Sequence, residues 1–229
     1  MNPRVLYRAA SYATDARSAA DSVISALTPA AWYRNATGVT ESGGFASQWD
    51  DYSGNARHLV QGVGTNQPAY AAGVLTFDGL DNYMVASTWL QAQPVSIYIV
   101  CKQATWTATD RFFDGTTADS MAVTQITATP TIAPNGVAGL SNGDLAVNTR
   151  GIVACVFNGV SSSIRVNNQT KVSGNVGATS PGGFTLGSRA GGGQQGNIAA
   201  EEVVIFSAAH DDATQDSVIT ALNNALTVF

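Results

Sequence analysis

The sequence has few charged residues. Only 12% of its 229 residues are Asp, Glu, Lys or Arg, and the eleven basic residues are scattered along the chain without a cluster. The net charge is −5 and the pI is about 4.8. Proteins that bind a phosphate backbone concentrate positive charge on one surface, so this composition argues against nucleic acid as a partner. The 45% hydrophobic content excludes an intrinsically disordered chain.

Long apolar runs are also missing. No run approaches the roughly 20 residues that a membrane-spanning helix needs. The first residues lack the apolar core of a signal peptide. We therefore expect no membrane partner, and synthesis in a cytoplasm without export through a signal peptide.

Residues typical of metal and redox sites are scarce. The two cysteines, Cys101 in "VSIYIVCK" and Cys155 in "GIVACVF", are far apart and form no CxxC motif. We predict two buried free thiols, with a disulfide as the alternative. No cofactor and no metal site are expected from these residues.

Few residues are suited to acid–base catalysis. The only glutamates are Glu41, Glu201 and Glu202, and the only histidines are His58 and His210. Retaining glycoside hydrolysis needs two carboxyl groups about 5 Å apart over one site. Adjacent strand residues face opposite sides, so we predict that Glu201 and Glu202 point apart. No catalytic residue is predicted, and the expectation is that the protein is not an enzyme.

Helices are predicted at the two ends of the chain. Apolar residues with a helical period mark the segment before Pro29, which ends it. A second stripe follows Asp211 and Asp212, which favour a helix start, and predicts a helix over about 211–226. Residues 1–29 are interpreted as a helical arm for docking or oligomerisation. The residues of the first stripe are Ala16, Ala19, Ala20, Val23, Ile24 and Leu27.

The segment between these helices has the period-two pattern of strands. "VSIYIVCK" places Val95, Ile97, Ile99 and Cys101 on one face, and "GIVACVF" is apolar on both faces, as in a central strand. Turn sequences such as "APNG", "SNGD" and "SPGG" separate these runs. Many short strands without helices between them predict an antiparallel sandwich or barrel. With the terminal helix, residues 30–229 form the predicted domain.

Three short motifs occur in a familiar order: "QWDDYSGNARHLVQ", then "QPAY", then "VLTFDGLDNYM". Together they resemble the opening of concanavalin A-like (LamG-like) jelly-roll domains, and the later strands are similar too. The resemblance covers residues 30–229 and implies an all-β, antiparallel jelly-roll sandwich. Ala56 and Asn82 depart from the family pattern, which weakens any acidic metal cage. The matching residues are Trp49, Asp51, Ser53, Gly54, Asn55, Gln67, Pro68, Tyr70, Phe77, Asp78, Gly79, Asp81 and Tyr83.

The stretch "WDDYSGNARHL" allows two interpretations. Asp50, Asp51 and His58 could form a metal or acid–base site. Alternatively, Asp51 accepts hydrogen bonds from the amides of residues 53–55, and Gly54 supplies an unusual backbone conformation. We favour this structural turn, in which Trp49 anchors the core and His58 starts the next strand. The predicted turn residues are Trp49, Asp51, Ser53, Gly54 and Asn55.

Two ligand sites remain open. Oxygen ligands from Asp51, Asn55, Asp78 or Asp81 would suit a calcium ion, although they lack the spacing of a dedicated loop.

A glycan site needs an aromatic ring face and a few fixed polar groups. The candidate rings are Trp89, Tyr98 and Trp106. The stretch "TWTATDRFFDG" makes Trp106, Asp110 and Arg111 the predicted glycan-binding residues.

The resemblance also implies a function, because such domains are common in tailed-phage structural proteins and bacterial surface proteins. The first hypothesis is a non-enzymatic bacteriophage virion protein that decorates the capsid, forms a head fibre or sits on the tail. Its partners would be other virion proteins, further copies of itself (a homotrimer is expected) and host-surface polysaccharide. The alternatives are a glycan-cleaving enzyme and a bacterial surface carbohydrate-binding module.

Overall fold

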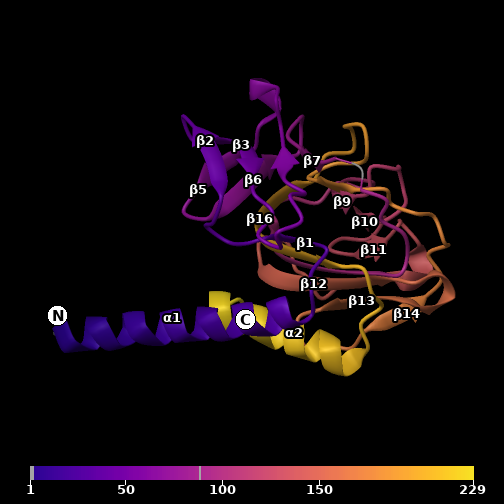
Figure 1. Ribbon diagram of the computed structural model, residues 1–229. Coiled ribbons are helices and arrows are strands. Elements are labelled where there is room, and N and C mark those ends of the chain that lie inside the picture. Colours follow the sequence, from indigo (N-terminus) through magenta and orange to yellow (C-terminus); the bar gives the residue numbers. More distant parts are fainter. Residues whose placement is uncertain (1–2, 88) are drawn as a thin grey trace.

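The protein is an antiparallel β-sandwich with a helix at each end of the chain (Figure 1). The computed structural model describes residues 3–87 and 89–229, with side chains from residue 15 onward. Helix α1 spans Pro3–Ala26 and helix α2 spans Asp212–Leu226. The all-β fold class with two terminal helices is therefore confirmed. None of the described helices is both long and apolar enough to cross a membrane.

The strands form one hydrogen-bonded path that folds back on itself, and every ladder is antiparallel. Strand β1 (Ala31–Tyr33) pairs beside this path with β16, and β2 (Val39–Ser42) pairs with β3. Along the path the strands are β11 (Ile132–Pro134), β10 (Val123–Gln125), β9 (Arg111–Asp114), β15 (Phe184–Leu186), β7 (Met84–Ala86), β4 (Leu59–Val60), β3 (Phe45–Trp49), β5 (Ala69–Ala71), β6 (Val74–Asp78), β16 (Asn197–Phe206), β8 (Val95–Gln103), β12 (Arg150–Phe157), β13 (Ser162–Val166) and β14 (Val172–Gly174).

The central strands β8, β12 and β16 bury both of their faces. Along β8, the predicted set Val95, Ile97, Ile99 and Cys101 points into the core between the two layers of the sandwich. The alternate residues of β8, β12 and β16 belong to a second cluster on the outer face. The interpretation of "GIVACVF" as a central strand is thus confirmed. Both cysteines are buried and free, as predicted, and burial raises the pKa of each thiol.

The two helices cover the outer face of these central strands. Ile24 of α1 and Val218 and Leu222 of α2 are fully buried against it. The start of α2 is capped, because the Asp211 side chain accepts a hydrogen bond of 2.8 Å from the Thr214 amide. The molecule therefore has three layers, two of strands and one of helices (Figure 1).

A buried ion pair attaches α1 to the sandwich. The Arg17 guanidinium donates to both carboxylate oxygens of Glu202, at 2.6 and 2.9 Å. The Glu202 carboxylate is fully buried and also accepts a 2.8 Å hydrogen bond from the Trp32 indole. Arg17 and Arg34 both pair with Asp21 as well. These contacts hold the second half of α1 against the sandwich. The division at residue 29 stays a prediction.

Candidate functional site

The Asp51 carboxylate organises the turn after β3. It accepts hydrogen bonds from the backbone amides of Ser53 (2.9 Å), Arg57 (3.0 Å) and Trp32 (2.9 Å). Only the Ser53 amide belongs to the predicted set of donors, because the Asn55 amide donates to the Ser53 hydroxyl instead. Asp51 is 7% exposed, so its charge is used in the turn and does not face solvent. It thereby joins the loop to β1.

Other residues of the same turn hold it against the segment between α1 and β1. The Asn55 side chain donates to the carbonyls of Pro29 and Ala30, at 3.2 and 3.1 Å. Gly54 has a φ of +88°, a conformation that side-chain-bearing residues rarely adopt. Trp49 is fully buried, and its indole donates to the Arg34 carbonyl at 3.1 Å. Hydrogen bonds therefore link Asp51, Ser53 and Asn55 within the turn, while Trp49 is anchored separately in the core.

The alternative interpretation of this stretch, a site built from Asp50, Asp51 and His58, finds little support in the geometry. The His58 Nδ1 atom lies 3.2 Å from Asp50 and accepts a 3.1 Å hydrogen bond from the Asp51 amide. The Asp51 carboxylate faces its own amides. Among residues 15–87 and 89–229, no group of three or more His, Cys, Asp or Glu side chains is arranged to hold a metal ion.

The residues considered for calcium are divided between two turns. Asp78 accepts hydrogen bonds from the amides of Leu80 (2.9 Å) and Asp81 (3.4 Å), within the turn that follows β6. Asp51 and Asn55 are used in the turn after β3. In each turn the aspartate carboxylate therefore accepts hydrogen bonds from nearby backbone amides.

The predicted glycan residues Trp106, Asp110 and Arg111 lie near β10 but do not line one cavity. Arg111 borders a depression of about 300 Å³, together with Thr124, Gln125 and the loop residue Gln194. Trp106 and Asp110 are not among the residues that line it. The Trp106 indole N–H is buried without a hydrogen-bond partner.

The Arg111 guanidinium is already engaged. It is 8% exposed and donates to the Thr109 carbonyl, the Thr124 hydroxyl and the Asp119 carboxylate. Hydrogen bonds first from Arg189 and then from Arg111 lower the pKa of the Asp119 carboxyl. The charges therefore compensate one another, and little of the guanidinium is free for a ligand.

The prediction that Glu201 and Glu202 point apart is wrong. The pairing of β16 with β8 shifts register between Ala200 and Glu202, so Glu201 is the extra residue of a β-bulge. Glu202 binds Arg17, and Glu201 binds Arg150, which also donates to carbonyls at the end of α2. Both carboxylates therefore lie on the helix-covered face. Each is neutralised by its own arginine.

A more open polar surface adjoins the Asp51 turn. Two depressions, of about 430 and 560 Å³, share Arg57 and Ser207. We call the combined surface the Arg57 groove. Its polar side chains come from the turn after β3, the end of α1 and the segment that follows it, the segment before β8, and Ser207 after β16. The residues that line it are Ser25, Thr28, Pro29, Ala30, Trp32, Tyr52, Ser53, Asn55, Arg57, Trp89, Leu90, Gln91, Ala92, Gln93, Pro94 and Ser207.

Two partly exposed aromatic side chains border the Arg57 groove. Tyr52 is 50% exposed, and Trp89 is half-buried with its indole donating to Gln91 at 3.0 Å. The Arg57 guanidinium lies 4.8 Å from the centre of the Trp89 ring and donates to the Ala30 carbonyl at 2.9 Å. Tyr98, the third aromatic candidate, is buried, and its hydroxyl is bonded to His210. The groove thus combines rings with fixed polar groups.

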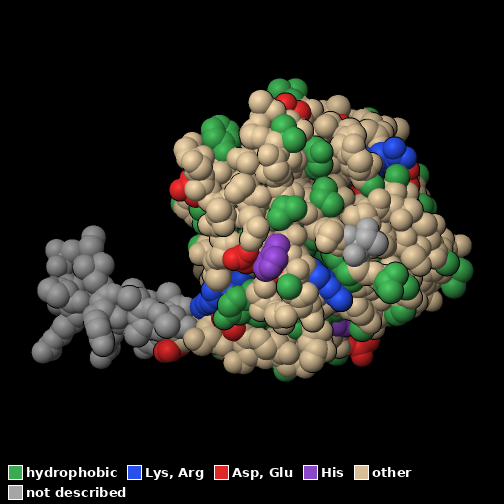
Figure 2. Space-filling model, turned by 45° about the horizontal axis from the view of Figure 1, so that its top comes forward, with side chains coloured by type: hydrophobic (Ala, Val, Ile, Leu, Met, Phe, Trp, Pro, Cys, Tyr) green, Lys and Arg blue, Asp and Glu red, His purple; other side chains and the backbone are tan. Residues whose placement is uncertain are grey.

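Sequence reasoning named Trp89 but missed the groove around it. Tyr52 and Arg57 lie inside the "WDDYSGNARHL" motif, whose acids and histidine were the predicted candidates. A signal was present, because an aromatic residue and an arginine flank the predicted turn. On the face shown in Figure 2, charged side chains are sparse and hydrophobic ones are scattered.

No protein-family model matches the chain, and a comparison with curated proteins finds no match. Solved structures do resemble it. A Trypanosoma rangeli sialidase mutant with trans-sialidase activity is 12% identical with a TM-score of 0.66, and the match covers 93% of this chain and 38% of that one. An arabinofuranosidase complexed with arabinofuranosyl-α-1,2-xylobiose is 14% identical with a TM-score of 0.62, covering 79% and 51%.

These similarities show the fold alone, because the identities are so low. The chain spans about two fifths of the sialidase and half of the arabinofuranosidase. Both are sandwich-containing glycosidases, which agrees with the lectin-like sandwich that the sequence motifs imply. The link to virion proteins stays a prediction.

Proposed function

We propose that this protein is a carbohydrate-binding β-sandwich module that holds a glycan in the Arg57 groove. The observation that carries the proposal is that two partly exposed rings, Tyr52 and Trp89, line adjoining depressions that also hold fixed amide, hydroxyl and guanidinium groups. An arginine lies over each ring, Arg34 over Tyr52 and Arg57 over Trp89. Sugars present apolar C–H faces and a fringe of hydroxyls, so they are recognised by this combination of groups.

The polar groups of the groove are held in place before any ligand arrives. Asn55 is fixed by two carbonyls, Arg57 by the Ala30 carbonyl and the Trp89 ring, and Gln91 by Trp89 and Ser207. A preorganised site loses less conformational entropy on binding. The groove consists of two depressions that adjoin at Arg57 and Ser207, an arrangement that suits an oligosaccharide rather than a single sugar.

The structural neighbours are named as glycan-cleaving enzymes, so cleavage is the second candidate. Hydrolysis by the common two-carboxylate mechanism needs an acid and a nucleophile or base over the bond. The described residues that line the Arg57 groove include no Asp or Glu. Binding without cleavage is therefore the function that this site supports best. The sequence-based hypothesis of a virion protein is compatible with it, with the glycan on the host surface.

The test is a glycan array followed by titration of tryptophan fluorescence on the full-length protein. The probes are arabinoxylan oligosaccharides, sialyllactose and bacterial surface polysaccharides. We expect a hit whose affinity falls roughly fivefold in Tyr52→Ala and in Trp89→Ala, because each loses a ring contact of about 1 kcal/mol.

The matched control is Trp106→Ala, which removes the other half-buried tryptophan and should leave binding unchanged. Each bound glycan is also incubated with the protein and assayed for new reducing ends. Absence of binding to every probe, or loss of binding only in Trp106→Ala, would contradict the proposed site. Release of reducing ends would favour the enzyme.

A further inference from the structure

The arginines of this protein are, with one exception, neutralised by a carboxylate of the same chain. Seven arginines lie within residues 15–87 and 89–229, and six of them form an ion pair with Asp or Glu. The seventh, Arg57, forms none within these residues. It therefore carries a positive charge that the described part of the fold does not compensate. The six paired residues are Arg17, Arg34, Arg111, Arg150, Arg165 and Arg189.

The contacts of the Arg57 side chain are with neutral groups. Its guanidinium donates one hydrogen bond, to the Ala30 carbonyl at 2.9 Å, and lies over the Trp89 ring. The nearest acid along the chain is Asp51, which is 7% exposed and accepts hydrogen bonds from three backbone amides. A guanidinium has five N–H donors in a rigid fork. Arg57 is therefore fixed in place and keeps donors for a ligand.

Arg57 also has the central position in the groove, because it lines both depressions. The neutral amides around it already donate within the protein. Asn55, Gln91 and Gln93 each donate to backbone carbonyls. Since the described residues that line the groove include no Asp or Glu, the group with spare donors is an unopposed cation. Such a group is best matched by an anion.

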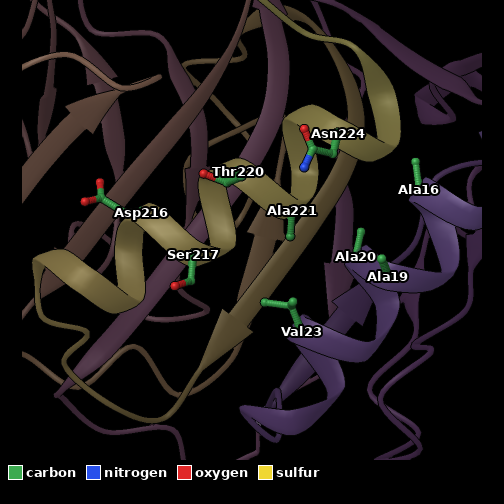
Figure 3. Close-up of a pocket in the computed structure, with 9 residues that line it drawn as sticks. All are labelled: Ala16, Ala19, Ala20, Val23, Asp216, Ser217, Thr220, Ala221 and Asn224. Carbon is green, nitrogen blue, oxygen red and sulfur yellow. The ribbon is translucent and has the colours of Figure 1, made fainter.

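Three other depressions of the described surface lack an unpaired cation. The trough between α1 and α2 (Figure 3) is lined by small and polar side chains and by Asp216, with no basic residue. The depression near β10 holds Arg111, which is paired with Asp119. A depression of about 590 Å³ beside the end of α2 holds Arg165, which is paired with Asp216. Among these surfaces, the Arg57 groove is the one suited to an anionic group.

We propose that the Arg57 groove binds a carboxylated oligosaccharide and that Arg57 recognises its carboxylate. This recognition rests on the proposed function of the groove, since it specifies which class of glycan binds there. A guanidinium donates two parallel hydrogen bonds to a carboxylate, and such charged bonds are stronger than neutral ones. Uronic and sialic acids carry this group, and its single negative charge balances the single positive charge of Arg57.

The overall charge of the protein does not explain a preference for acidic sugars. The net charge is −5, which repels an anionic ligand at long range. A preference for the acidic form of a sugar must therefore originate at a local cation, and a change at Arg57 should remove it.

Isothermal titration calorimetry of the full-length protein with matched probes measures this preference. The acidic probes are 3′-sialyllactose and trigalacturonic acid. Each is compared with its carboxyl-reduced form, in which a CH₂OH group replaces the carboxylate. We expect the acidic form of one pair to bind roughly tenfold more tightly than its reduced form. The pair that shows this difference identifies a sialic acid or a uronic acid as the source of the carboxylate.

Two variants of Arg57 separate its charge from its contact with Trp89. Arg57→Gln removes the charge and should abolish the difference between the acidic and reduced forms. Arg57→Lys keeps the charge without the fork and should retain part of the difference. A purely structural role in holding the Trp89 ring predicts an equal loss of affinity for both forms. Far-UV circular dichroism checks that each variant is folded.

Arg189→Gln is the matched control. It makes the same change in net charge at a residue that does not line the groove, so the full difference between the two forms should remain. Equal affinity for the two forms, a difference that persists in Arg57→Gln, or binding of neutral arabinoxylan oligosaccharides alone would overturn the carboxylate assignment and leave glycan binding in place. Absence of binding to every probe would overturn the proposed function as well.

Discussion

Glu202 is an acidic residue whose side chain is fully buried. Its carboxylate binds Arg17, the Trp32 indole and the Asn35 amide. Removing one partner of a buried ion pair leaves an uncompensated charge, which costs more than the pair contributes. The attachment of α1 to the sandwich therefore depends on the negative charge of the Glu202 carboxylate.

Glu202→Gln should lower the free energy of unfolding by about 3 kcal/mol. The reason is that the Arg17 guanidinium keeps only Asp21 as a charged partner. Urea denaturation followed by circular dichroism measures the change. Glu201→Gln is the control, since its pair with Arg150 is more exposed and should cost no more than about 1 kcal/mol. Equal losses in the two variants would contradict the assigned role of Glu202.

His210 is expected to make stability depend on pH. Burial lowers its pKa from the usual 6.5 and outweighs the nearby Asp211 carboxylate. The unfolded chain therefore binds a proton at a higher pH than the folded protein does. Stability is complete above about pH 6.5 and falls as the pH drops toward the lowered folded pKa.

Free energies of unfolding at mildly alkaline and mildly acidic pH should show this fall in the wild type and a smaller one in His210→Gln. The other histidine stays in both proteins, so the comparison isolates His210. An identical pH dependence in the variant would show that this imidazole does not contribute.

At the scale of elements, the helices are held by the outer face of the central strands. Leu222 is fully buried among residues of β8, β12 and β16. Leu222→Ala should therefore destabilise the protein by about 2–5 kcal/mol through the cavity that it leaves. Thermal and urea unfolding measure the loss. Val160→Ala, at a 76% exposed position, is the control and should change stability by less than about 0.5 kcal/mol.

Much of the fold could be predicted at this scale, because alternation is a local signal. The inward face of residues 95–101 and the helix over 211–226 follow from period and capping alone. The bulge at Glu201 did not follow, since it depends on how β16 aligns with β8. Nor did the Arg57 groove, because Arg57 and Trp89 come from loops that only the folded chain brings together.

At the scale of the whole molecule, the three-layer arrangement determines which surfaces stay exposed and can bind a ligand. The helices cover one outer face of the sandwich, and the turn after β3 meets the end of α1 beside the segment before β8. The polar groove lies at this junction. The rigid sandwich therefore supports a binding surface made of loops, which is a common division of roles in β proteins.

The central claim is that a glycan binds beside Trp89. The four indole N–H signals of a ¹⁵N-labelled sample report on it, because Trp32 and Trp49 are buried while Trp89 and Trp106 are partly accessible. During titration with an oligosaccharide selected on the array, the Trp89 signal should shift and saturate while the Trp106 signal stays in place. A shift of the Trp106 signal alone, or no shift with any oligosaccharide, would contradict the account.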